Sequence, residues 1–131
     1  LLAIFSDWAL TVLRVVMGLI FVVHGWPKLK DLKTTAANFS AMGFKPGGLW
    51  GTIAAIVEFF GGLTLILGFY VQVAAALFVI QFFVINVWKI AKRQPFVGGL
   101  EFDLLIFAVA LALFTLGAGA LSLDRFFFLW F

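Results

Sequence analysis

The sequence contains no cysteine and only one histidine. The missing thiols exclude disulfides, thiol relays and cysteine-ligated metals or clusters. One histidine and two methionines leave little from which this chain alone could build a transition-metal site. We therefore expect no metal site and no intrinsic cofactor.

Charged residues are also scarce, at 11% of 131 residues, whereas 65% are hydrophobic. Soluble domains contain about 25% charged and about 45–50% apolar residues. A soluble fold of this size could not bury so much apolar surface, so the surplus must face lipid. The composition predicts a single integral membrane domain over residues 1–131, in contact with the lipid bilayer.

Long apolar runs, by contrast, are abundant. A helix needs roughly 20 apolar residues to cross the hydrocarbon core of a bilayer. Four stretches qualify, at residues 8–26, 49–70, 71–90 and 100–116. Gly68 predicts a tight turn between the second and third, and Pro95 with Gly98 and Gly99 interrupts the chain before the fourth. We expect an all-α polytopic membrane protein, a bundle of four transmembrane helices.

The connection between the first two spans has a helical pattern of its own. Pro27 suits the start of a helix, and Gly43 with Pro46 suits its end. Apolar or small residues recur at helical spacing between them, at Leu29, Leu32, Ala36, Phe39 and Gly43. The pattern predicts an interfacial amphipathic helix between the first and second spans. An ordinary solvated linker with chance periodicity is the alternative.

Basic residues are concentrated in the first and third connections, at Lys28, Lys30, Lys33, Lys45, Lys89, Lys92 and Arg93. The opposite side has only Arg125, because Arg14 lies within a span. The positive-inside rule therefore predicts a multi-pass protein of the cell (inner) membrane, with both of these loops in the cytoplasm and both termini outside. Since the net charge of +3 is explained by topology, we expect no nucleic-acid partner.

Glu58 lies about midway through the second span, where an ionised side chain costs about 2.5–3.5 kcal/mol. Small residues surround it at helical spacing, so Glu58 is expected to face another helix. Counting residues from the helix ends puts Arg14 at a similar depth, which predicts a buried Arg14–Glu58 pair with Gln81 of the third span beside it. The pair could simply fix helix packing, or Glu58 could relay protons or orient a polar headgroup such as a quinone's.

A second polar cluster is expected at the cytoplasmic rim. His24 and Lys28 share one face at the end of the first span, and Glu101 and Asp103 open the fourth span on the same side. Asn86 lies near that level in the third span. These residues could be interfacial anchors and caps. Alternatively, His24, Lys28, Asn86 and Glu101 form a mixed-charge pocket for an anion or a reducible headgroup.

Several segments together resemble the DoxX family in order and spacing across nearly the whole chain. They are Arg14 in the first span, HGWPKL at residues 24–29, IVEFFGGLTLILG at residues 56–68, Glu101, and GAGALSLD at residues 117–124. The matching family positions are Arg14, His24, Gly25, Lys28, Glu58, Glu101, Ser122 and Asp124. The resemblance implies a four-helix inner-membrane protein and a quinone-linked redox role, as in a small subunit of thiosulfate:quinone oxidoreductase.

Three function classes follow from these observations. A redox subunit would bind quinone near the rim cluster and would need an electron-donating partner protein. A non-catalytic structural or assembly subunit would use its small-residue helix faces and its C-terminal FFFLWF to dock another membrane protein. A small-solute transporter would need a polar path across the bilayer and usually internal repeats, which the sequence does not display.

Overall fold

The computed structural model describes residues 2–128. The elements are η1 (Leu2–Phe5), α1 (Ser6–Lys30), α2 (Leu32–Ala41), α3 (Gly47–Leu67), α4 (Val71–Ala91), η2 (Phe96–Leu100), α5 (Glu101–Leu116) and α6 (Leu123–Phe128). Four segments are long and apolar enough to cross a membrane: Ser6–Lys30, Gly47–Leu67, Val71–Ala91 and Phe96–Leu116. The predicted all-α membrane bundle is confirmed, and residues 129–131 of the FFFLWF tail lie outside the described residues.

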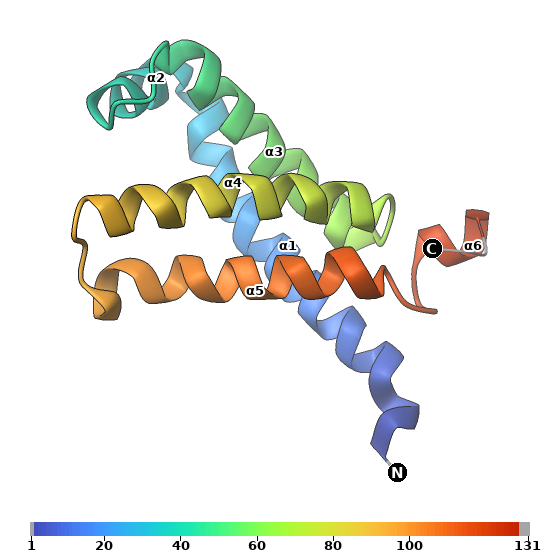
Figure 1. Ribbon diagram of the computed structural model, residues 1–131. Helices are drawn as coiled ribbons and strands as arrows, with labels where there is room; N and C mark the ends of the chain where they lie inside the picture. The colour runs from blue at the N-terminus through green and yellow to red at the C-terminus, as the bar shows by residue number, and fades with distance from the viewer. Residues whose placement is uncertain (1, 129–131) are drawn as a thin grey trace.

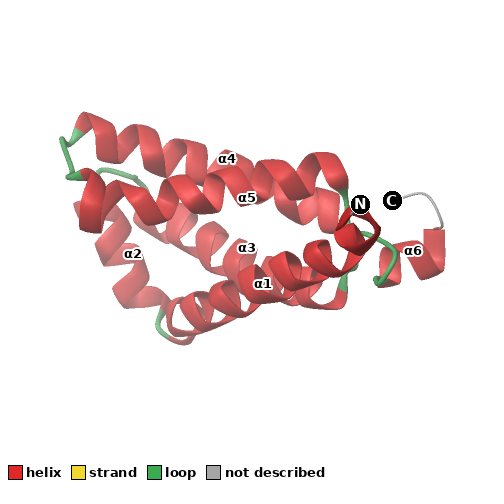
Figure 2. Cartoon of the chain, turned by 90° about the horizontal axis from the view of Figure 1, so that it is seen from below, coloured by secondary structure: helices red, strands yellow, loops and turns green. Residues whose placement is uncertain are grey.

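The four long helices form two pairs that cross each other (Figure 1). In one pair α1 packs along α3, and in the other α4 packs along α5. Figure 2 shows the two pairs from below as two layers, α4 with α5 in one and α1 with α3 in the other. We call the end that carries α2 and the α4–α5 connection the loop side, and the end that carries both termini and the α3–α4 turn the terminal side.

Glycine allows α1 and α3 to approach closely. A Cβ added to Gly18 would lie 2.5 Å from the Gly62 carbonyl oxygen, and one added to Gly25 would lie 2.6 Å from the Phe59 nitrogen. Backbones at this separation leave no room for side chains between them. Gly62 of α3 therefore faces α1, and these contacts fix which residues of the two helices lie opposite one another. Other small residues of α3 face different helices, since Gly51 lies against Thr35 of α2 and Gly61 against Phe78 of α4.

The crossing point of the two helix pairs is filled by buried apolar side chains. The rings of Phe21 in α1 and Phe78 in α4 stack with centroids 4.1 Å apart. Met17, Leu65 and Leu113 are buried in the same cluster. This core separates the polar groups of the loop side from those of the terminal side.

The boundary between the first span and the following helix differs from the sequence prediction. Helix α1 continues through Pro27 to Lys30, and the break comes at Asp31, whose Oδ1 accepts a hydrogen bond from the Thr34 backbone N–H at 3.1 Å. The Asp31 side chain thus caps the start of α2, whereas Pro27 lies inside α1 without ending it. Helix α2 packs on α3. The two helices are so close that a Cβ added to Gly47 would lie 2.0 Å from the Ala36 carbonyl oxygen.

Candidate functional site

The predicted pair between Arg14 and Glu58 is wrong. Arg14 donates to three backbone carbonyls on the terminal side, those of Leu65 at 2.8 Å, Ala118 at 2.7 Å and Leu121 at 3.0 Å. Helical side chains lean toward the N-terminus of their own helix. Because α1 and α3 are antiparallel, Arg14 leans toward the terminal side while Glu58 leans toward the loop side.

The Arg14 guanidinium holds together the segment between α5 and α6. Its bonds to Ala118 and Leu121 attach this segment to α1, and Asp124 attaches it to the α3–α4 turn. The buried Asp124 carboxylate accepts from the backbone N–H groups of Tyr70 and Val71, the latter at 2.9 Å. Ser122 adds a bond to the Gly119 carbonyl at 2.7 Å. These motif positions are explained by packing on the terminal side.

Glu58 instead bonds to Lys28 and Gln81. It is 3% exposed, and its Oε2 lies 2.5 Å from the Lys28 Nζ and 3.3 Å from the Gln81 Nε2. Both bonds end on Oε2, so Oε1 has no hydrogen-bond partner among residues 2–128. The structure thus brings Gln81 beside Glu58, and Lys28 takes the place expected for Arg14.

These polar groups border a cavity of about 750 Å³ between the two helix pairs on the loop side. Its polar lining includes His24, Lys28, Glu58, Gln81, Lys89 and Asp103. Most of the remaining wall is apolar, with Ile53, Leu77 and Ile80 among its residues. Leu77 and Ile80 are 45% and 63% exposed, so the cavity opens sideways onto the surface that faces lipid. A cavity of this size is typical of sites for small organic ligands.

His24 borders the cavity with one ring nitrogen already engaged. Its Nδ1 lies 2.7 Å from the Ile20 carbonyl oxygen, which can only accept, so Nδ1 carries the proton. In the neutral imidazole Nε2 is then the acceptor. The ring lies beside Phe102, with centroids 6.2 Å apart. His24 can therefore accept a hydrogen bond or a proton from a molecule in the cavity.

Lys89 and Asp103 form a second ion pair across the α4–α5 connection. Lys89 also donates to the Gly99 carbonyl at 2.9 Å. From the sequence, Lys89 is only a topology signal, and Asp103 is a residue of the rim cluster that opens the fourth span. The available signal was their position, since both residues lie near the ends of antiparallel helices joined by a short loop. With Lys28 and Glu58, this pair gives the cavity equal numbers of basic and acidic groups.

Two residues of the predicted headgroup pocket lie outside the cavity. Asn86 is buried against α5, where its Nδ2 donates to the Phe82 carbonyl at 2.7 Å and the Asp103 carbonyl at 3.2 Å. Glu101 is exposed and accepts a bond from the Gly98 N–H at 3.1 Å. Asp103 lies two residues beyond Glu101 and so faces a different side of α5. The rotation of α5 thus brings Asp103 to the cavity and keeps Glu101 in the loop.

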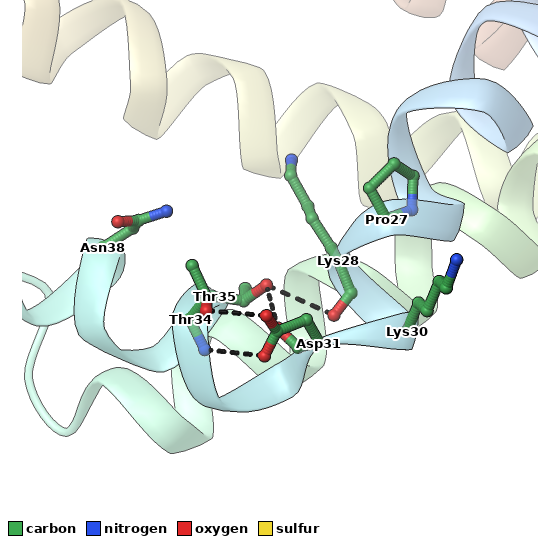
Figure 3. Close-up of a pocket in the computed structure, with 7 residues that line it drawn as sticks. All are labelled: Pro27, Lys28, Lys30, Asp31, Thr34, Thr35 and Asn38. Atoms are coloured by element: carbon green, nitrogen blue, oxygen red, sulfur yellow. Dashed lines mark hydrogen bonds between the residues drawn. The ribbon is translucent and has the colours of Figure 1, made fainter.

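A smaller, polar hollow of about 600 Å³ adjoins the cavity at the α1–α2 junction (Figure 3). It shares Lys28, Thr35 and Asn38 with the cavity. Asp31 lies in this hollow, and hydrogen bonds from the Thr34 side chain and backbone lower the pKa of its carboxyl. Lys28 extends away from this Asp31–Thr34 cap in Figure 3, and its Nζ reaches Glu58. The hollow and the cavity therefore meet at Lys28.

Comparison with known proteins gives one family and two curated relatives. A family model described as DoxX matches residues 9–89. The chain is 33% identical over 116 residues to "Putative oxidoreductase CatD" of Bacillus subtilis, and the aligned region covers 88% of this chain and 84% of that protein. It is 30% identical over 123 residues to "Inner membrane protein YqjF" of Escherichia coli, with 92% of each chain covered. No solved structure matches at comparable significance.

Proposed function

The chain belongs to the DoxX family of membrane proteins, and from this membership we propose that it is a membrane subunit that binds a quinone headgroup in the cavity beside Glu58. The observation that carries the proposal is a buried cluster of polar groups at one end of an apolar cavity that opens toward lipid. The name of CatD describes that protein as an oxidoreductase, which is consistent with a redox role.

The chemistry of the cavity suits a neutral ligand with a polar head and an apolar tail. The two ion pairs, Lys28–Glu58 and Lys89–Asp103, balance in charge, so neither a cation nor an anion is favoured by net charge. Lys28, Lys89 and Gln81 offer N–H donors for carbonyl oxygens such as those of a quinone. An isoprenoid tail would leave through the lateral opening past the exposed apolar residues of α4.

A bound quinone would accept two electrons and two protons to become the quinol. The part of this chemistry that the chain's residues can supply is proton handling. His24 at Nε2 and Glu58 at Oε1, the carboxylate oxygen without a hydrogen-bond partner in the described chain, would each take up a proton from water and pass it to the headgroup as it is reduced. The electrons would come from a separate redox protein, because this chain has no cysteine and a single histidine with which to hold a redox centre.

We also propose that the loop side faces the cytoplasm. The loop side carries five basic residues that make no ion pair in the described structure, namely Lys30, Lys33, Lys45, Lys92 and Arg93. The terminal side carries Arg125. The positive-inside rule orients such a distribution with the loops inward. A relative named as an inner membrane protein fits a location in that membrane.

Binding of a short-chain quinone analogue to protein in lipid nanodiscs tests the function. We expect saturable binding to the unmodified chain and its loss in His24→Ala and Glu58→Gln, because both side chains border the cavity. Glu101→Gln is the matched control, since it makes the same chemical change on an exposed residue outside the cavity. Equal affinity in Glu58→Gln, His24→Ala and the unmodified protein would contradict the proposal.

The melting temperature must be measured for each variant, because Glu58→Gln also removes a buried charge. His24 is exposed, so His24→Ala separates loss of a ligand contact from loss of stability. Failure of the unmodified protein to bind, together with a stoichiometric non-redox partner in mild detergent, would favour the structural or assembly subunit instead.

A further inference from the structure

We propose that the polar hollow at the α1–α2 junction is a one-sided water entrance through which protons reach Glu58 from the loop side only. The inference deepens the proposed function, because protons for a headgroup beside Glu58 would then come from one side of the membrane. The access itself depends only on the cavities and on the residues between them, whatever the ligand is.

The first observation is that the hollow and the cavity share a wall. Lys28, Thr35 and Asn38 line both spaces, and Asn38 is an exposed side chain of α2. The Lys28 side chain is 35% exposed, whereas that of Glu58 is 4% exposed, and their charged atoms are 2.5 Å apart. The ammonium of Lys28 thus stands between solvent in the hollow and the buried carboxylate. Figure 3 shows Lys28 and Asn38 reaching out from α1 and α2 on the same side of the hollow.

The second observation is that the opposite route is closed by apolar packing. Toward the terminal side, Glu58 is followed along the bundle by Phe21 and Phe78, whose stacked rings are 2% and 0% exposed. Leu65 beyond them is 0% exposed, and α1 and α3 are in backbone contact at Gly18 and Gly62. A packed apolar core of this kind does not hold water, because a buried water molecule needs polar partners.

These two features together make a half-channel. A hydronium ion that enters the cavity from the hollow would lose a proton as one of its O–H bonds breaks, and an O–H bond would form on the Glu58 carboxylate, leaving a water molecule. No electron moves in this step. Lys28 lies on this passage, because it lines both spaces and its ammonium donates to Oε2 of Glu58. A charged or polar residue in a membrane helix often marks such a proton route.

The natural absence of cysteine makes the route measurable with single-cysteine variants. Silver ion is the probe, because it is small, charged and reactive toward thiols. Vesicles are treated with silver nitrate on one side and then labelled with a fluorescent maleimide in denaturing detergent, so that protection reports access. Lys33→Cys, labelled by an impermeant maleimide in intact vesicles, identifies the loop side.

We expect silver to protect Gln81→Cys from the loop side and not from the terminal side, since Gln81 borders the cavity and the Lys28–Glu58 pair remains in this variant. Ala75→Cys is the matched control: it is 0% exposed, lines neither space and should stay unprotected from both sides. Asn38→Trp, added to Gln81→Cys, should abolish the protection by filling the shared wall.

Protection of Gln81→Cys from both sides, or from neither, would overturn the half-channel. Unchanged protection in the Asn38→Trp background would also overturn it, because silver would then enter by another opening. Glu58→Cys provides a second variant at the proposed end point, with the same expected sidedness. These outcomes are independent of quinone binding, so silver access can succeed where analogue binding fails, and the reverse.

Discussion

The ion pair between Lys28 and Glu58 gives the sharpest test of the structure. Glu58 has a side chain that is 4% exposed, so its charge depends on Lys28 and Gln81. Lys28→Met would remove the ammonium and leave the carboxylate with Gln81 alone. We expect the free energy of unfolding of Lys28→Met to fall while that of the double variant Lys28→Met/Glu58→Gln partly recovers.

The magnitude follows from burial. Removing one partner of a fully buried ion pair typically costs about 3–5 kcal/mol. Lys28 is 35% exposed and Gln81 still donates at 3.3 Å, so we expect about 3 kcal/mol for Lys28→Met, at the low end of that range. Glu58→Gln removes a charge-assisted bond and should cost about 1.5–3 kcal/mol. The coupling energy between the two positions should be about 3 kcal/mol, at the upper end of the range for residues in contact, so that it offsets the cost of Glu58→Gln in the double variant.

Arg14 provides the internal control. Its carbonyl partner Leu65 lies seven residues beyond Glu58 in α3, about 10 Å along the helix axis. Sites at this separation without shared partners usually act additively. Arg14→Met should therefore destabilise the protein, because three carbonyls lose their donor, two of them in buried bonds, but its cost should add to that of Glu58→Gln without a coupling energy.

The assay is unfolding in mild detergent, followed by circular dichroism during titration with a denaturing detergent, for each single and double variant. A Lys28–Glu58 cycle that is strictly additive would refute the pair. A coupled Arg14–Glu58 cycle would refute the register between α1 and α3 and restore the arrangement that the sequence predicts.

Two further predictions concern the helix contact and the junction on the loop side. Gly62→Ala would place a Cβ 2.7 Å from the Gly18 oxygen, so the melting temperature should fall by the equivalent of about 1–3 kcal/mol. Gly48→Ala is the control, because a Cβ there has no atom within 4 Å and should not lower the melting temperature. Equal effects of the two substitutions would contradict the contact between α1 and α3. Hydrogen bonds from Thr34 lower the pKa of the Asp31 carboxyl. The ionised carboxylate therefore stabilises α2 fully at pH values above its ordinary pKa of about 3.9, and this stabilisation is lost as the pH falls through the lowered pKa. The Thr34 amide NMR shift should therefore titrate with a midpoint below about 3.9 and become insensitive to pH in Asp31→Asn, and a midpoint at or above that value would contradict the cap.

The sequence alone determined that the chain is a four-span helical membrane protein. Span length and apolar content are local properties, and lipid imposes the same requirement on each segment wherever it packs. The turn at Gly68 was predictable for a similar reason, since a residue with a φ of 73° at a helix end favours glycine. The end of α1 was less predictable, because Pro27 is tolerated inside the helix and the cap at Asp31 competes with it.

The sequence also indicated that Glu58 faces another helix, since small residues surround it, and that Gln81 lies at its depth. It pointed to Arg14 as the partner, because depths counted from the assumed helix ends put Arg14 within a few ångströms of Glu58 and Lys28 at the rim. The structure instead places Gly25 of α1 beside Phe59 of α3, so Lys28 lies within one turn of the level of Glu58. The choice was made by the lean of each side chain toward its own helix N-terminus and by the glycine contacts that set the register between α1 and α3.

The cavity itself was decided only by the tertiary structure. It exists because the α1–α3 pair crosses the α4–α5 pair and leaves a space on the loop side, and no helix pattern records a crossing angle. The same geometry explains why Asp103 lines the cavity while Glu101 remains in the loop, although two positions in the chain separate them. A residue's sequence position gives its depth in the membrane, but its direction depends on how its helix is rotated by packing against helices from distant parts of the chain.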